Sequence, residues 1–199
     1  MTHTEAADII RRAWQEVHGR APTDNEVRFT QAVAWLETHY GRAGQFGPLA
    51  ARGLYNWANI EKRRTGDTCP EGWEPGMDAG NAVCFKVYPS DYEAAKALIH
   101  TLTKRHWPTL AAMAEGTPEA LARAMKASPA YYEAPESLYA TAIRNSLKAM
   151  GANLPIPTPT SPSTASSPKA SFMPLLLLAG LGAGAYMLTR NSGKRIRFA

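Results

Sequence analysis

The 199-residue sequence predicts a mainly α-helical domain with at most a small β-hairpin, then a linker and a single C-terminal transmembrane helix. Three observations support this prediction. Before residue 150, helix-capping signals repeatedly precede apolar residues at helical spacing. The segment 83–88, VCFKVY, shows the alternation of a short strand. A long uncharged run lies near the end of the chain.

The clearest helix signal lies between Thr23 and Gly41. Thr23 and Glu26 form a capping-box pattern, and an apolar stripe follows at helical spacing: Phe29, Val33, Leu36 and Tyr40. Glu37 lies at the edge of this stripe, where loss of hydration raises the pKa of a carboxyl group and makes it a proton donor near neutral pH. The alternative is a plain surface glutamate at a helix end.

Similar signals predict the other helices, which we expect near 4–18, 90–104, 107–116, 117–127 and 135–150. The glycine-rich segment 41–53 predicts no regular element, and 54–60 suits either a strand or one helical turn. We expect the hairpin near 66–88.

The charge of the chain argues against nucleic-acid binding by the folded domain. All 17 acidic residues precede position 150, whereas five of the 22 basic residues follow it, so the domain is formally neutral. The short basic run 62–64 is interpreted as a solvated loop, because a nucleic-acid binder should show a basic face.

Two cysteines, Cys69 and Cys84, bracket a loop rich in glycine and proline. They have no histidine or cysteine partners at zinc spacing, so we expect neither a metal nor a cofactor. A disulfide is plausible outside the cytoplasm, whereas two free thiols are expected in a reducing compartment.

The C-terminal quarter predicts a membrane anchor. Residues 151–170 form a Pro/Ser/Thr-rich linker, 171–189 a transmembrane helix that includes 17 uncharged residues, and 190–199 a basic tail. The positive tail places the C-terminus inside and the domain outside, in a bacterial inner membrane or the internal membrane of a phage virion. The pair Gly180 and Gly184 permits packing against other membrane helices, and capsid proteins are further possible partners.

Four segments stand in an informative order: AWLETHYG (34–41), YNWANI (55–60), FKVYPSDYEAAKALI (85–99) and AYYEAPESLYATAI (130–143). Over about residues 6–150 the sequence resembles the glucosaminidase-type peptidoglycan hydrolases, which include autolysins and phage lysins. The resemblance implies a lysozyme-like helical domain with a β-lobe, acting on the glycan strands of peptidoglycan.

The resemblance also implies roles for individual residues. Glu37 matches the catalytic glutamate that protonates the glycosidic oxygen, and Tyr40 belongs to the same motif, in which His39 replaces a small residue. Asn56 matches the next motif, with Asn59 at a usual glycine position. Substrate-binding residues are expected to be Tyr40, Asn56, Tyr131 and Tyr132, although the last two tyrosines equally suit core packing.

Glycoside hydrolysis needs a second carboxylate or help from the N-acetyl group of the substrate. The resemblance implies that the second carboxylate lies on the β-lobe. Glu71 is preferred, because a disulfide at Cys69 would hold it in place, and the alternatives are Glu74, Glu61 and Asp67. Each of these could also be an ordinary loop acid.

The sequence therefore predicts a membrane-anchored hydrolase of the β-1,4 bonds of peptidoglycan. Two alternatives remain: a non-catalytic wall-binding or structural membrane protein of a phage particle, and a lytic transglycosylase, which needs only one glutamate.

Overall fold

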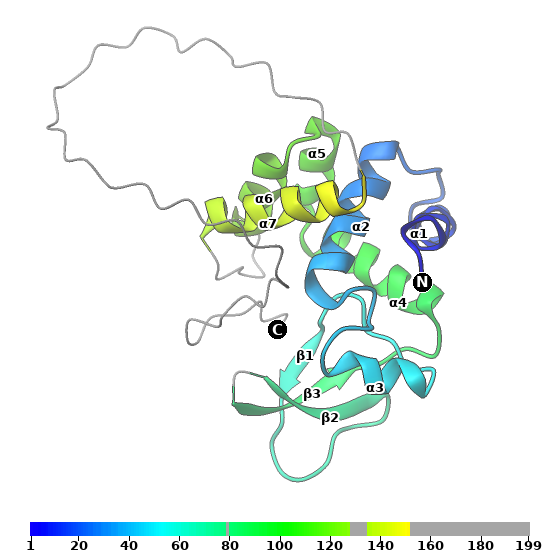
Figure 1. The fold of residues 1–199 in the computed structure, drawn as a ribbon, viewed down its shortest axis with the longest axis vertical. Coiled ribbons are helices and arrows are strands. Elements are labelled where there is room, and N and C mark those ends of the chain that lie inside the picture. The colour runs from blue at the N-terminus through cyan, green and yellow to red at the C-terminus, as the bar shows by residue number, and fades with distance from the viewer. Residues whose placement is uncertain (79, 128–134, 152–199) are drawn as a thin grey trace, which may run out of the picture. The chain divides into compact units, whose positions relative to one another are not determined.

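Helices dominate the computed structural model, which describes residues 1–78, 80–127 and 135–151 (Figure 1). The helices are α1 (His3–His18), α2 (Asp24–Thr38), α3 (Phe46–Ala51), α4 (Asp91–His100), the π-helix η1 (Thr101–Arg105), α5 (Pro108–Glu115), α6 (Pro118–Ala127) and α7 (Glu136–Ala149). The strands are β1 (Glu61–Arg63), β2 (Trp73–Asp78) and β3 (Asn81–Lys86). The predicted fold class is thus confirmed as mainly helical with a small sheet, although the sheet has a third strand.

The capping box predicted for α2 is present. The Thr23 hydroxyl accepts the Glu26 N–H at 3.3 Å, and the Glu26 carboxylate accepts the Thr23 N–H at 2.6 Å. The carboxylate also forms an ion pair with Arg20 at 2.5 Å. These bonds satisfy amide groups that the first helical turn leaves without partners, and so they set the point where α2 begins.

The main hydrophobic core lies between α2 and the helices around it, α1, α4, α5 and α7. Its fully buried side chains include Trp14, Phe29, Leu98, Ile99, Leu102, Met113, Leu121, Ile143 and Leu147. This packing fixes α2 along most of its length, because α2 contributes buried residues at nine positions.

A second, smaller core holds the sheet. The strand order is β1-β3-β2, both pairings are antiparallel, and Val83, Phe85 and Val87 pack with Phe46 and Leu49 from the region of α3. We call residues 46–87 the β-lobe. A disulfide joins Cys69 to Cys84 on β3, with the Cα atoms 5.7 Å apart. Of the two states expected from the sequence, the structure therefore has the disulfide and not two free thiols.

Several local predictions were wrong. Segment 41–53 contains α3, whose Pro48 is tolerated because it lies in the first helical turn. Segment 54–60 forms neither strand nor helix, apart from a single bridge between Tyr55 and Tyr88. The basic run begins on strand β1, where Lys62 and Arg63 pair with β3, and so it is not simply a loop.

The predicted membrane anchor lies outside the residues that the structure describes. Within the three ranges given above, no helix is long and apolar enough to cross a bilayer. The linker, the expected transmembrane helix at 171–189 and the basic tail lie almost entirely outside those ranges, as do Tyr131 and Tyr132.

Candidate active site

Glu37 lies in the last turn of α2, one residue before the helix ends at Thr38. Its side chain is half-buried, and Val33 and Ala34, one turn earlier, are buried. Since residues three and four apart share a helix face, the carboxyl group leaves the helix at the edge of the core. The half-burial of Glu37 agrees with the edge position that the helical period predicts, and its catalytic role stays a prediction.

A left-handed turn follows directly after Glu37 and Thr38. His39, Tyr40 and Gly41 have φ angles of 48°, 58° and 72°, and only glycine adopts such angles without steric cost. His39 is exposed, and the centroid of its ring lies 4.2 Å from that of Trp35. The exposed position has room for the histidine ring. Two non-glycine residues in this conformation require support from their surroundings.

Thr38 supplies part of that support. Its hydroxyl oxygen accepts the Gly41 N–H at 2.8 Å and lies 3.2 Å from the carbonyl oxygen of Trp57. The side chain is 1% exposed, so these bonds are shielded from water. Thr38 therefore ties the turn to the segment 54–60.

Gly41 makes the second connection to this segment. A Cβ atom built at Gly41 would lie 3.1 Å from the backbone nitrogen of Asn56, so the two backbones are in close contact. Asn56 is completely buried, and its side chain bonds to the N–H groups of Ala58 and Ile60 and to the Ile60 carbonyl. Asn59, with φ of 51°, takes the left-handed conformation, which asparagine tolerates better than most residues do.

Arg42 and Asp91 bring in the third segment, at the start of α4. The guanidinium forms two bonds with the Asp91 carboxylate, at 2.9 and 2.7 Å, and a third with the Tyr40 carbonyl at 2.6 Å. The Trp57 indole N–H also donates to Asp91, at 2.9 Å. The hydrogen bonds with Asp91 raise the pKa of Arg42 above its ordinary value, and the network links the turn to both neighbouring segments.

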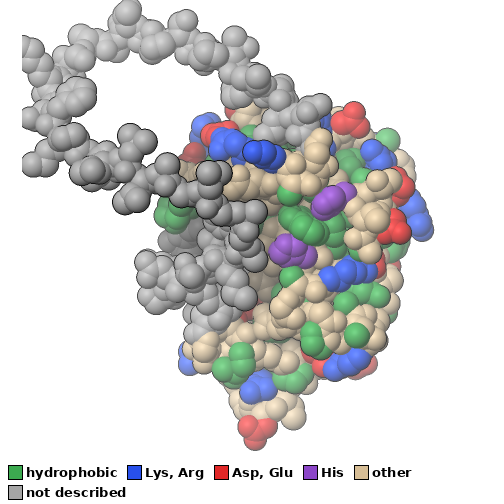
Figure 2. Space-filling model, in the orientation of Figure 1, with side chains coloured by type: hydrophobic (Ala, Val, Ile, Leu, Met, Phe, Trp, Pro, Cys, Tyr) green, Lys and Arg blue, Asp and Glu red, His purple; other side chains and the backbone are tan. Residues whose placement is uncertain are grey.

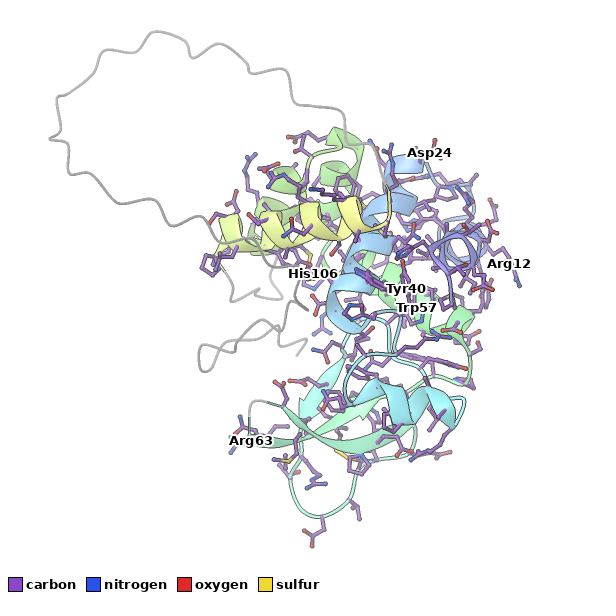
Figure 3. The ribbon with its side chains drawn as sticks, in the orientation of Figure 1. Arg12, Asp24, Tyr40, Trp57, Arg63 and His106 are labelled. Carbon is purple, nitrogen blue, oxygen red and sulfur yellow. A yellow bond between two sulfur atoms is a disulfide. The ribbon has the colours of Figure 1, made fainter. Side chains whose placement is uncertain are left out.

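Tyr40 and Asn56, expected to contact substrate, have buried side chains in the structure. Tyr40 is 1% exposed, its hydroxyl lies 2.8 Å from His3 Nδ1, and its ring lies 5.3 Å from that of Trp57, as their adjacent labels in Figure 3 illustrate. Burial raises the pKa of Tyr40 to about 12, so the hydroxyl stays protonated at physiological pH. We therefore regard both residues as supports of the turn that follows Glu37.

The acids of the β-lobe differ in their surroundings. Glu71 and Asp67 are exposed in the loop before β2, and Glu74 forms an ion pair with Arg52 at 2.7 Å. Glu61 is only 8% exposed and directly follows Ile60, which is bonded to Asn56. Glu61 is thus connected to the Glu37 turn through a short series of contacts, which sequence spacing alone does not reveal.

A hollow of about 490 Å³ lies elsewhere, lined by Glu119, Glu136, Ser137, Ala140 and Thr141. Its two carboxylates face arginines, Arg144 and Arg123, on the same helices α6 and α7. None of the residues around the Glu37 turn lines it, so we do not regard it as the catalytic site. Among the described residues, no group of three or more His, Cys, Asp or Glu could hold a metal ion.

Comparisons of the chain with protein-family models, curated proteins and solved structures find no match. The function therefore has to be inferred from the geometry around Glu37.

Proposed function

We propose that this chain is a membrane-anchored peptidoglycan hydrolase that cleaves β-1,4 glycosidic bonds of the wall glycan, of the N-acetylglucosaminidase type, with Glu37 as general acid. One observation carries the proposal. Three segments far apart in the sequence meet at the turn that follows a half-buried glutamate, through the contacts of Gly41 with Asn56 and of Arg42 with Asp91. Fixing a catalytic group on a rigid scaffold is what general acid catalysis requires.

In the proposed reaction, Glu37 donates its proton to the glycosidic oxygen as the bond from that oxygen to the anomeric carbon breaks. The sugar passes through an oxocarbenium-like state, and water then adds to the anomeric carbon. Where a second carboxylate assists as base, it takes up the proton of this water. Where the N-acetyl group of the substrate assists, Glu37, now a carboxylate, takes up that proton.

Two residues are candidates for the second carboxylate. Glu61 is buried close to the Asn56 loop, whereas Glu71 is exposed beyond Cys69. Glu74 is a weaker choice because Arg52 already neutralises it. Burial leaves Glu61 little surface for a substrate, so Glu71 stays the first candidate, and variants of each to glutamine distinguish them by the loss of cleavage.

The anchoring completes the proposal. The predicted helix at 171–189 would hold the chain in the bilayer, and the linker of about 20 residues, at roughly 3.1 Å each when extended, would give a reach of about 60 Å. Such a reach would allow a domain outside the membrane to act on the wall, in a bacterium or during phage entry or lysis.

A lytic transglycosylase, which needs one glutamate, is the second candidate, because Arg52 already neutralises Glu74 and Glu61 is buried. Incubating the full-length protein with purified peptidoglycan and analysing the products by mass spectrometry separates the candidates. New reducing ends support the hydrolase, and anhydro-sugar ends support the transglycosylase. Binding to peptidoglycan without any cleavage would favour a non-catalytic wall-binding protein.

A further inference from the structure

The face of the sheet opposite Phe85 carries lysines and apolar side chains together. In antiparallel strands, directly paired residues point to the same face, and every second residue along a strand does so too. Trp73 pairs with Lys86, and Lys62 pairs with Cys84, two residues before Lys86. By the same register the outer sheet face comprises Lys62, Trp73, Pro75, Met77, Ala82, Cys84 and Lys86. Cys84 is buried and bonded to Cys69, so the open part of this face is the part around Trp73, Pro75 and Met77.

Two ammonium groups converge on one indole ring of this face. The Nζ atom of Lys62 lies 4.5 Å from the Trp73 ring centroid, and that of Lys86 lies 5.5 Å from it. A Cβ atom at Gly72 would come within 3.0 Å of Lys86 Nζ, so the glycine leaves room for this ammonium group. The attraction between each cation and the ring holds two like charges near each other.

Neither lysine has a carboxylate within salt-bridge distance among the residues that the structure describes. Lys96 provides a contrast, since it pairs with Glu16 at 2.7 Å and Glu93 at 2.9 Å. The domain as a whole is formally neutral, so two adjacent cations without an anion do not simply reflect a basic protein. A negatively charged partner would complete this arrangement.

The same face offers an open apolar surface. Met77 is 53% exposed, Pro75 is exposed, and Trp73 is half-buried. Figure 2 shows basic, acidic and hydrophobic side chains interspersed over the lower part of the molecule, where Figure 1 places the β-lobe. The partner should therefore combine carboxylates with apolar surface that can lie against an indole ring.

We propose that the outer sheet face binds the peptide stems of peptidoglycan, with their carboxylates at Lys62 and Lys86 and their aliphatic parts on Trp73. The inference takes its ligand from the proposed function, but it requires no cleavage. The face is opposite the one that packs on α3, so it would act as a wall-binding surface separate from the Glu37 turn.

The test is binding of the full-length Glu37→Gln protein, in detergent, to purified sacculi that have been stripped of accessory polymers. Sacculi with free stem carboxylates are compared with sacculi whose carboxylates have been converted to amides. We expect amidation to weaken binding about three- to tenfold, as expected for two exposed charge pairs. The Lys62→Gln/Lys86→Gln variant should show the same loss and no response to amidation.

The matched control is Lys104→Gln/Lys148→Gln, which removes two exposed helical lysines outside the β-lobe and should bind like the parent. Equal binding by the two double variants, no binding by the parent protein, or no effect of amidation would overturn the inference. Cleavage is measured separately with unmodified Glu37. Lysine-dependent binding without any cleavage would refute the proposed hydrolase and leave this inference standing.

Discussion

The guanidinium of Arg42 and the carboxylate of Asp91 form a two-pronged ion pair between residues 49 positions apart, with N–O distances of 2.9 and 2.7 Å. The side chains are 31% and 17% exposed, so the pair is partly shielded from water. Through Arg42 the pair reaches the Tyr40 carbonyl, and through Asp91 it reaches the Trp57 indole. It connects the helix that carries Glu37 to the rest of the domain.

Replacing Asp91 with Asn should destabilise the fold by about 2 kcal/mol, because the guanidinium then lies partly buried without a counter-charge. Denaturant unfolding measures the change. The control is Asp8→Asn, which breaks an exposed pair with Arg11 and should cost less than about 0.5 kcal/mol. Equal costs at the two positions would show that the Arg42–Asp91 pair has no special role.

The same variant tests the link to activity. If Asp91 positions the Glu37 turn, Asp91→Asn should lower kcat more than it raises KM for soluble glycan fragments, under conditions where the protein is folded. Asp91→Glu, which keeps the charge, should recover part of the loss. A variant that loses stability but keeps kcat would confine Asp91 to a structural role.

Replacing Gly41 with Ala should destabilise the protein by about 1 kcal/mol more than replacing Gly19 with Ala. Both glycines have positive φ angles, 72° and 69°, so both variants carry a similar backbone cost. Only at Gly41 would the new methyl group meet another backbone, that of Asn56, whereas nothing lies within 4 Å at Gly19. Thermal or chemical unfolding of the two variants gives the difference, and equal losses would contradict the close contact.

Much of the helical fold could be predicted because the signals are local. The start of α2 depends on Thr23 and Glu26, which are three residues apart in the sequence. Both hydrogen bonds of this capping box are present in the structure. The short strand β1 could not be predicted, since its three residues form a strand only through pairing with β3, about 20 residues away. The glycine-rich composition of 41–53 concealed α3, in which Leu49 and Phe46 are held by packing on the sheet.

The surroundings of Glu37 were partly predictable for the same reason. The position of Glu37 near the end of α2 follows from the helical period, but the left-handed turn after it depends on contacts with Asn56 and Asp91 that no local pattern encodes. The burial of Asn56 and Tyr40 follows from these contacts as well. A motif match identifies residue types, whereas tertiary packing decides which side chains face a ligand.

Stability should fall as the pH drops from about 6.5 towards 4, because of His106. This residue is fully buried, and burial, with a contribution from Arg105, lowers its pKa to about 4. In that pH range the unfolded imidazole binds a proton that the folded one does not, so the loss approaches about 3 kcal/mol at pH 4. Carboxylates also titrate there, so the measurement is the difference in pH dependence between wild type and His106→Gln. Identical slopes would contradict the assignment.

Removing the disulfide with Cys69→Ser and Cys84→Ser should destabilise the β-lobe by about 3 kcal/mol, the chain-entropy value for a loop of this length, since the cysteines are 15 positions apart. Hydrogen exchange should show faster exchange for the amides of β2 and β3, with little change in α2 and α4. Uniformly faster exchange across all helices would mean that the β-lobe and the helices unfold as one unit.

The central claim is that Glu37 supplies the proton for glycan cleavage, and its most direct test is the release of reducing ends from peptidoglycan by full-length wild type and Glu37→Gln. The account predicts cleavage by wild type, at least a hundredfold loss in Glu37→Gln with an unchanged melting temperature, and full activity in Glu115→Gln, a matched change at an exposed position. Cleavage by Glu37→Gln at the wild-type rate, or no cleavage by wild type, would contradict it.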